Sequence, residues 1–199
     1  IVQNCFGYHL TPAGMIFENG ARAVGATVLP AGTGQTELQV RAAADLGTTA
    51  YAGTPDYLKV ILDKAAEQGV ALRIARAAVS GGALFPSLRA EYAERGVTCL
   101  QCYATADLGL IAYESPPPDG GTPEGMIVDE GVILEIVTPG TGDPVADGEV
   151  GEVVVTSLNP DYPLIRFATG DLSAVLPGES PCGRTNMRIK GWMGRADQT

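Results

Sequence analysis

Histidine and cysteine are scarce in this 199-residue chain, which has one histidine, His9, and four cysteines. Four cysteines at this length do not form a disulfide framework, so we expect a reducing, cytoplasmic compartment. A zinc site normally needs four ligands, and no ligand spacing around a single histidine suggests one. Long apolar runs are missing too, and none reaches the length that spans a membrane.

Basic residues are outnumbered, with 13 Lys and Arg against 23 Asp and Glu and a formal net charge of -10. Nucleic acids and anionic membranes attract clustered Lys and Arg, so we expect neither as the main partner. The imbalance is concentrated in residues 111–165, which hold eleven acidic and no basic side chains. A solvated acidic surface is the simplest interpretation.

Apolar residues are abundant, at 45% of the chain, and the 26 glycines and 14 prolines follow no period, as expected of a globular protein. Between residues 20 and 110, short apolar runs alternate with helix-like segments. We predict strands over 48–52, 72–79 and 97–102, and helices over 36–46, from Pro55 to Gly69 and over 86–95. This alternation predicts an α/β fold with a mostly parallel βαβ sheet.

Small or polar residues follow three of these strands, at Gly53-Thr54, Ser80–Ala83 and Tyr103–Asp107. Each loop alone is explained by ordinary turn chemistry. The carboxyl ends of parallel strands share one edge of the sheet, however, and ligands bind there in such folds. We therefore predict a binding site along this edge.

After residue 110 the pattern changes to the alternation of antiparallel strands, with strands predicted over 132–137 and 149–157. The predicted organisation is an α/β subdomain over 1–110, a small antiparallel β-barrel-like subdomain over 111–195 and a hinge over 196–199 that leads to a missing C-terminal domain. The chain begins without methionine and stops with no helix terminator nearby, so we interpret it as a piece of a longer protein.

Two motifs near the end are the most specific. Arg166-Phe167-Ala168-Thr169-Gly170-Asp171 is similar to an R-x-x-T-G-D motif, and Gly194-Arg195-Ala196-Asp197 is similar to a G-R-x-D hinge motif. With the weaker Phe6-Gly7-Tyr8 and Gly25–Pro30 segments, the chain resembles the adenylate-forming acyl-CoA ligases, and within them the phenylacetate-CoA ligase family.

The resemblance implies attack of a carboxylate on the α-phosphate of ATP, which gives an acyl-adenylate and pyrophosphate, and then acyl transfer to coenzyme A. The implied cofactors are ATP or AMP, Mg²⁺ and coenzyme A, the partner is a small-molecule carboxylic acid, and a homodimer is a candidate assembly. The resemblance assigns nucleotide binding to Gly81, Gly82, Ala83, Tyr103, Thr105, Asp171 and Arg195, an acid pocket to Phe6, Tyr8 and His9, the hinge to Asp197 and magnesium to Asp107.

Three features depart from the family pattern. Ala104, Ala106 and Asp107 stand where the family commonly has glycine, a hydroxyl residue and glutamate, which keeps open a second hypothesis of a non-catalytic nucleotide-binding or scaffolding relative. Ser115, Ser180 and Cys182 do not reproduce a structural zinc site that some members carry, so no zinc is expected. The family's phosphate-gripping loop and adenylation lysine are not in the sequence, and the isolated chain is expected to be inactive.

Two residues have simpler interpretations beside the functional ones. His9, assigned above to the acid pocket, is more often a structural histidine whose hydrogen bonds are satisfied. Trp192, the only tryptophan of the chain, lies next to the hinge motif and is expected to be a packing residue.

Overall fold

The computed structural model of the chain describes residues 1–198, and Thr199, the last residue of the predicted hinge, lies outside them. The chain divides into two compact units, Ile1–Gln101 and Cys102–Thr199. This division falls before the change of composition near residue 110, because one long strand, β5 (Thr98–Thr105), belongs to both units. Its residues up to Gln101 pair with β4, and those from Cys102 pair with β6.

The first unit is built on a parallel sheet, as predicted for an α/β fold. Its strand order is β5-β4-β3-β1-β2, and each neighbouring pair is parallel. The chain therefore adds β2 on one side of β1 and the remaining strands on the other. The strands are β1 (Val2–Asn4), β2 (Val28–Pro30), β3 (Ala50–Gly53), β4 (Arg76–Val79) and the first half of β5.

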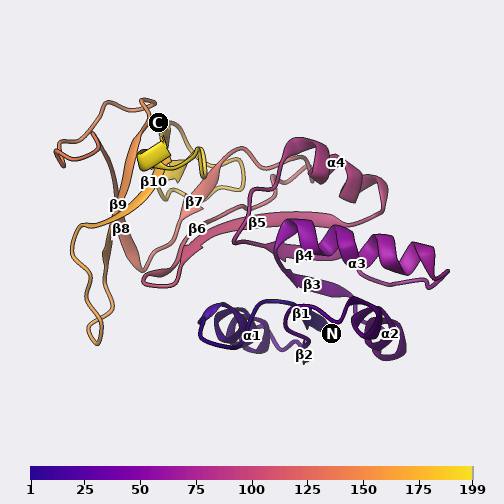
Figure 1. Cartoon of the computed structure of the whole chain (residues 1–199). Coiled ribbons are helices and arrows are strands. Elements are labelled where there is room, and N and C mark those ends of the chain that lie inside the picture. Colours follow the sequence, from indigo (N-terminus) through magenta and orange to yellow (C-terminus); the bar gives the residue numbers. More distant parts are fainter. Residues whose placement is uncertain (199) are drawn as a thin grey trace. The chain divides into compact units, whose positions relative to one another are not determined.

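Four helices connect these strands (Figure 1). Helix α2 has the predicted bounds, and α3 begins at Pro55 as predicted, because proline at the first helical position has no N–H to leave unpaired. Helix α1 and strand β1 were not predicted, since α1 contains two glycines and lacks a side-chain N-cap. The helices are α1 (Ala13–Ala23), α2 (Thr36–Leu46), α3 (Pro55–Glu67) and α4 (Pro86–Glu94).

The core of the first unit lies between the sheet and three of its helices. Val40 of α2, Leu58 and Ile61 of α3 and Tyr92 of α4 are fully buried in the same hydrophobic cluster as Tyr51 of β3. Right-handed crossovers place α2, α3 and α4 on one face, because all three connect toward the same side of the sheet, whereas α1 connects toward the other.

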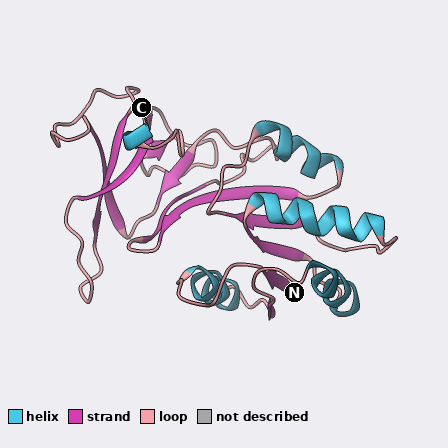
Figure 2. Cartoon of the chain, viewed as in Figure 1, coloured by secondary structure: helices cyan, strands magenta, loops and turns pink. Residues whose placement is uncertain are grey.

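The second unit consists of antiparallel strands and one short 3-10 helix, η1 (Ala196–Gln198), in the described residues (Figure 2). One sheet has the order β11-β12-β7-β6-β5 and the other the order β10-β9-β8. The strands are β6 (Gly109–Tyr113), β7 (Met126–Val128), β8 (Val132–Val137), β9 (Gly151–Ser157), β10 (Phe167–Ser173), β11 (Val175–Leu176) and β12 (Arg188–Ile189).

One hydrophobic cluster joins the two sheets of this unit, with Ile111 and Ile189 from the first and Leu134 and Val153 from the second. The prediction of a small antiparallel subdomain is thereby confirmed, and β8 has the predicted bounds. Helices long and apolar enough to cross a membrane are absent from residues 1–198.

Strand β5 is longer than predicted. Tyr103 and Thr105 were assigned to a loop after the strand, but they pair with Ala112 and Gly109 of β6. The sequence alone does not indicate this extension, because the partner strand that makes it favourable follows β5 across a tight turn. The register shifts between Tyr103 and Ala104, a bulge that redirects the side chains on either side of it.

Candidate functional site

Asp171 lies on β10, where an irregularity in the strand directs its carboxylate inward. The pairing of β10 with β9 shifts register between Ala168 and Leu172, and Gly170 inside this stretch has φ +73°. Thr169 Oγ1 donates to the carbonyl of Val153 at 2.9 Å and accepts from the Asp171 N–H at 3.1 Å. The Thr-Gly-Asp sequence thus fixes the aspartate, whose side chain is only 12% exposed.

Three side chains donate hydrogen bonds to the Asp171 carboxylate. Tyr103 Oη donates to Oδ2 at 2.8 Å, and Trp192 Nε1 and Arg195 Nη1 each donate to Oδ1 at 3.1 Å. The same Nη1 atom also donates to the carbonyl of Thr169 at 3.1 Å. We call Tyr103, Asp171, Trp192 and Arg195 the carboxylate cluster.

The pKa shifts of Arg195 and Tyr103 keep both side chains as hydrogen-bond donors to the Asp171 carboxylate. The hydrogen bond and charge of Asp171 raise the pKa of Arg195. Burial, first of all, together with the neighbouring Asp171 carboxylate, raises the pKa of Tyr103 well above its ordinary value. Tyr103 therefore remains a neutral O–H donor, and Arg195 a cation, across the physiological pH range.

The two sequence motifs meet because the segment before η1 runs along β10. Leu172 N–H donates to the carbonyl of Gly194 at 2.9 Å, Met193 N–H donates to the carbonyl of Leu172 at 2.8 Å, and Asp171 forms an isolated antiparallel bridge with Arg195. Sequence analysis assigned Asp171 and Arg195 to one site, and the structure brings them together. Asp197 is exposed, with its Oδ1 at 3.6 Å from Arg195 Nε.

The structure corrects the expectation that Trp192 is a packing residue. Half of its surface is exposed, and its one polar atom donates to Asp171. Sequence reasoning missed this donor and the bond from Tyr103 Oη, because both depend on the register of strands far apart in the chain. The one available signal was the position of Trp192 two residues before Gly194 in the hinge motif.

The glycine loop after β4 lies in the first unit, at the carboxyl edge of the parallel sheet. A methyl group placed on Gly81 would lie 3.7 Å from Cγ2 of Thr54, which follows β3, and 4.0 Å from Cε1 of Phe6, which follows β1. Gly81 and Gly82 are exposed and Ala83 is half-buried. The ends of three strands therefore meet at this exposed glycine loop.

The predicted acid-pocket residues follow β1 and differ in their surroundings. Phe6 is buried and stacks on Phe17, with ring centroids 4.2 Å apart. Tyr8 Oη accepts from Asn4 Nδ2 and donates to a Glu18 carboxylate oxygen, both at 2.8 Å. Burial, followed by that carboxylate, raises the pKa of Tyr8 to about 12. His9 is exposed.

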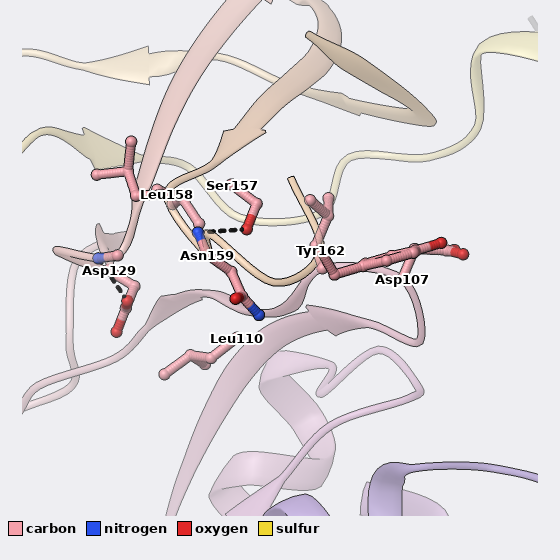
Figure 3. A pocket seen from close by; sticks show the side chains of 10 residues that line it. Asp107, Leu110, Asp129, Ser157, Leu158, Asn159 and Tyr162 are labelled. Carbon is pink, nitrogen blue, oxygen red and sulfur yellow. Dashed lines mark hydrogen bonds between the residues drawn. The ribbon is translucent and has the colours of Figure 1, made fainter. Parts of the chain in front are cut away.

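Asp107 lies in the turn between β5 and β6 and is exposed. It lines a hollow of about 410 Å³ within the second unit, whose other walls include Leu110, Asp129, Asn159 and Tyr162 (Figure 3). Figure 3 draws Asp107 and Tyr162 at one end of this hollow and Asp129 and Leu158 at the other. Thr105, the candidate phosphate contact, accepts from Leu108 N–H at 3.1 Å.

Among residues 1–198, His, Cys, Asp and Glu side chains form no group of three or more that could hold an ion unaided. A nucleotide-bound Mg²⁺ needs only one or two carboxylates besides phosphates and water, which the exposed Asp107 can provide. Cys182 lies 3.1 Å from the hydroxyl of Ser180, and hydrogen bonds with Ser180 and Ser115 lower its pKa to about 7.

Comparison with known proteins identifies the family. Residues 9–159 match the family of AMP-binding enzymes. The chain belongs to this family. It is 32% identical over 208 residues to the phenylacetate-coenzyme A ligase of Escherichia coli (strain K12) and 29% identical over 204 residues to that of Thermus thermophilus. The chain spans about 45% of the length of each of these relatives. The match to the Escherichia coli ligase covers 98% of this chain, and the match to the Thermus thermophilus ligase covers 99%.

Solved structures confirm the fold. A 2-hydroxyisobutyryl-CoA ligase, crystallised in an open conformation with 2-HIB-AMP and CoA, superimposes with a TM-score of 0.88 at 23% identity, over 98% of this chain and 44% of that one. A luciferase-like enzyme from the mealworm Zophobas morio gives a TM-score of 0.69 at 15% identity, over 98% of this chain and 48% of that one. The predicted resemblance to adenylate-forming ligases is therefore confirmed at the level of family and fold.

Proposed function

We propose that this chain forms part of an AMP-forming acid–CoA ligase that converts a carboxylic acid to an acyl-adenylate and then to a coenzyme A thioester, with aryl acids such as phenylacetate as the substrate class. The observation that carries the proposal is the buried carboxylate of Asp171, joined to Arg195 of the second motif at 3.1 Å. Relatives named phenylacetate-coenzyme A ligase, matched along nearly the whole chain, support the substrate class.

Asp171 has the chemistry that a ribose requires. A ribose presents two neighbouring hydroxyls, and one ionised carboxylate accepts both as charge-assisted hydrogen bonds. Arg195 has further N–H groups beyond the one bonded to Asp171, and its side chain is 40% exposed, so it can also reach an anionic phosphate. The cluster thus combines an acceptor for the sugar with a donor for the phosphate.

The remaining predicted site residues are assigned roles within each unit separately. In the first unit, we propose that the loop Gly81, Gly82 and Ala83 accepts the flat adenine, because small residues let the backbone approach closely. In the same unit, Phe6, Tyr8 and His9 would contact the acid. In the second unit, Tyr103 would pack against the nucleotide and Thr105 contact its phosphates, Asp107 would face a nucleotide-bound Mg²⁺, and Asp197 would mark the hinge.

The cytoplasm is the proposed location, because four cysteines in a chain of this length do not form a disulfide framework. A homodimer remains a candidate assembly.

The test is adenylation by the complete polypeptide that carries this sequence. Exchange of labelled pyrophosphate into ATP, measured across a panel of aryl and short aliphatic acids with Mg²⁺, should depend on the acid and be strongest with an aryl acid. The 199-residue chain by itself should show no such exchange, because positioning and charge stabilisation need the rest of the site. AMP binding without exchange by the complete polypeptide would instead support a nucleotide-binding relative, as the substitutions Ala104 and Ala106 suggest.

A further inference from the structure

The only polar side-chain atom of Trp192, the indole Nε1, donates a hydrogen bond to the Asp171 carboxylate. The indole has a single N–H group, and it donates to Oδ1 at 3.1 Å. Arg195, the other donor to Oδ1, has five N–H groups and also bonds the carbonyl of Thr169. Arg195 can therefore turn to another acceptor and remain hydrogen-bonded, whereas Trp192 cannot.

Hydrogen bonds on both sides of Trp192 hold its main chain against β10. Ser173 Oγ donates to the carbonyl of Gly191 at 2.7 Å, and Met193 N–H donates to the carbonyl of Leu172 at 2.8 Å. Trp192 is thus fixed to β10 on both sides. A tryptophan with half of its surface exposed contributes little to a hydrophobic core, so packing alone does not explain its position.

The carboxylate has almost no free acceptor capacity. An ionised carboxylate offers roughly four lone-pair sites. Trp192 and Arg195 occupy Oδ1, and Tyr103 occupies one site of Oδ2. The donors therefore fix the rotation of the carboxylate, and an incoming pair of hydroxyls meets an acceptor of defined orientation once the mobile donor, Arg195, has released Oδ1.

We propose that Trp192 is a positioning residue for nucleotide recognition: its indole N–H holds the Asp171 carboxylate in the orientation that accepts the ribose hydroxyls. This inference rests on the proposed function. It predicts that Trp192 acts only on ligands that have those hydroxyls, whereas a residue with a general structural role would affect all nucleotides equally.

The test compares AMP with 2′,3′-dideoxy-AMP, which lacks both hydroxyls. In the complete polypeptide, Trp192→Phe should weaken AMP binding about three- to tenfold, the value of one hydrogen bond, and leave the dideoxy nucleotide unchanged. Met193→Leu, at the neighbouring half-exposed position without a side-chain bond to Asp171, is the matched control and should bind both as wild type does. Equal losses for the two nucleotides, or no loss for either, would overturn the proposal.

A second measurement tests the proposal even if the Trp192→Phe variant does not fold. In the ¹H–¹⁵N spectrum of the complete polypeptide, resonance assignment identifies the indole signal of Trp192. That signal should move upfield in Asp171→Asn and stay in place in Asp161→Asn, and AMP should shift it more than dideoxy-AMP does. Identical shifts with both nucleotides would overturn the positioning role alone. Absence of AMP binding by the wild-type complete polypeptide would overturn the proposed function as well.

Discussion

Tyr103 and Asp171 lie 68 residues apart in sequence, yet the Tyr103 hydroxyl donates to Asp171 Oδ2 at 2.8 Å. Tyr103 is on β5 and Asp171 on β10, in the two different sheets of the second unit. The bond therefore connects these sheets through a buried, charge-assisted contact. Through its hydroxyl, Tyr103 therefore holds the Asp171 carboxylate, which its aromatic ring alone could not do.

Removing this hydroxyl should destabilise the second unit. Tyr103→Phe keeps the ring and deletes the donor, and hydrogen bonds to charged groups contribute about 1.5–3 kcal/mol. We expect a loss of this size in the free energy of unfolding from urea denaturation. Tyr162→Phe, at an exposed tyrosine of the same unit, should change it by less than about 0.5 kcal/mol. Equal denaturation midpoints for the two variants would contradict the contribution of the Tyr103 bond.

Gly170→Ala should impair the carboxylate cluster more than it impairs folding. A Cβ atom at Gly170 would lie 2.7 Å from Arg195 Nη2, a flexible group that must then move away from Asp171. Gly140→Ala is the matched control, because Gly140 has φ +77° against +73° for Gly170 and no atom within 4 Å of the added carbon. Both variants should lose about 1–2 kcal/mol of stability from the left-handed backbone.

Only Gly170→Ala should weaken AMP binding, because the displaced Arg195 guanidinium no longer lies where it can reach the phosphate. Calorimetry on the complete polypeptide would measure this loss. If both glycine variants bind AMP as the wild type does, the position of the Arg195 guanidinium beside Gly170 has no part in nucleotide recognition.

Cys182 should be the most reactive thiol at neutral pH. Hydrogen bonds with Ser180 and Ser115 lower its pKa to about 7, whereas burial raises that of Cys5 to about 12. A lowered pKa favours the thiolate, so alkylation by iodoacetamide should reach half of its maximal rate near pH 7. Ser180→Ala should move this midpoint upward, toward the ordinary value of about 8.5.

Mass spectrometry of the alkylated chain assigns the rate to each cysteine. A midpoint near pH 8.5 in the wild type, unchanged by Ser180→Ala, would show that the hydroxyls do not stabilise the thiolate.

Local patterns predicted the parts of the fold that local chemistry determines. Helix α2 and strand β8 have their predicted bounds, because Gly47 in the left-handed conformation ends α2, and Val132–Val137 is rich in the β-branched residues that strands favour. Strand β1, with only three residues, was missed because its stability comes from parallel pairing with β2 and β3, which sequence alone does not reveal.

The sequence motifs of the site could be predicted, but the hydrogen bonds between its side chains could not. Asp171 and Arg195 were assigned from short motifs, and the antiparallel bridge between them accounts for their proximity. The bonds from Tyr103 and Trp192 depend on strand register and a bulge, which no local pattern specifies. The same holds for Tyr8, whose hydroxyl is bonded to both Asn4 and Glu18.

Titration with AMP tests the central claim most directly. In the complete polypeptide, Asp171→Ala removes the acceptor of two ribose hydroxyls, each bond being worth about 1.5–3 kcal/mol before desolvation, so AMP affinity should fall by roughly ten- to a hundredfold. Asp161→Ala removes an exposed carboxylate of the same unit and should leave the affinity at the wild-type value. Equal affinities for the wild type and both variants would contradict the assignment of Asp171 to the ribose, and with it the proposed nucleotide site.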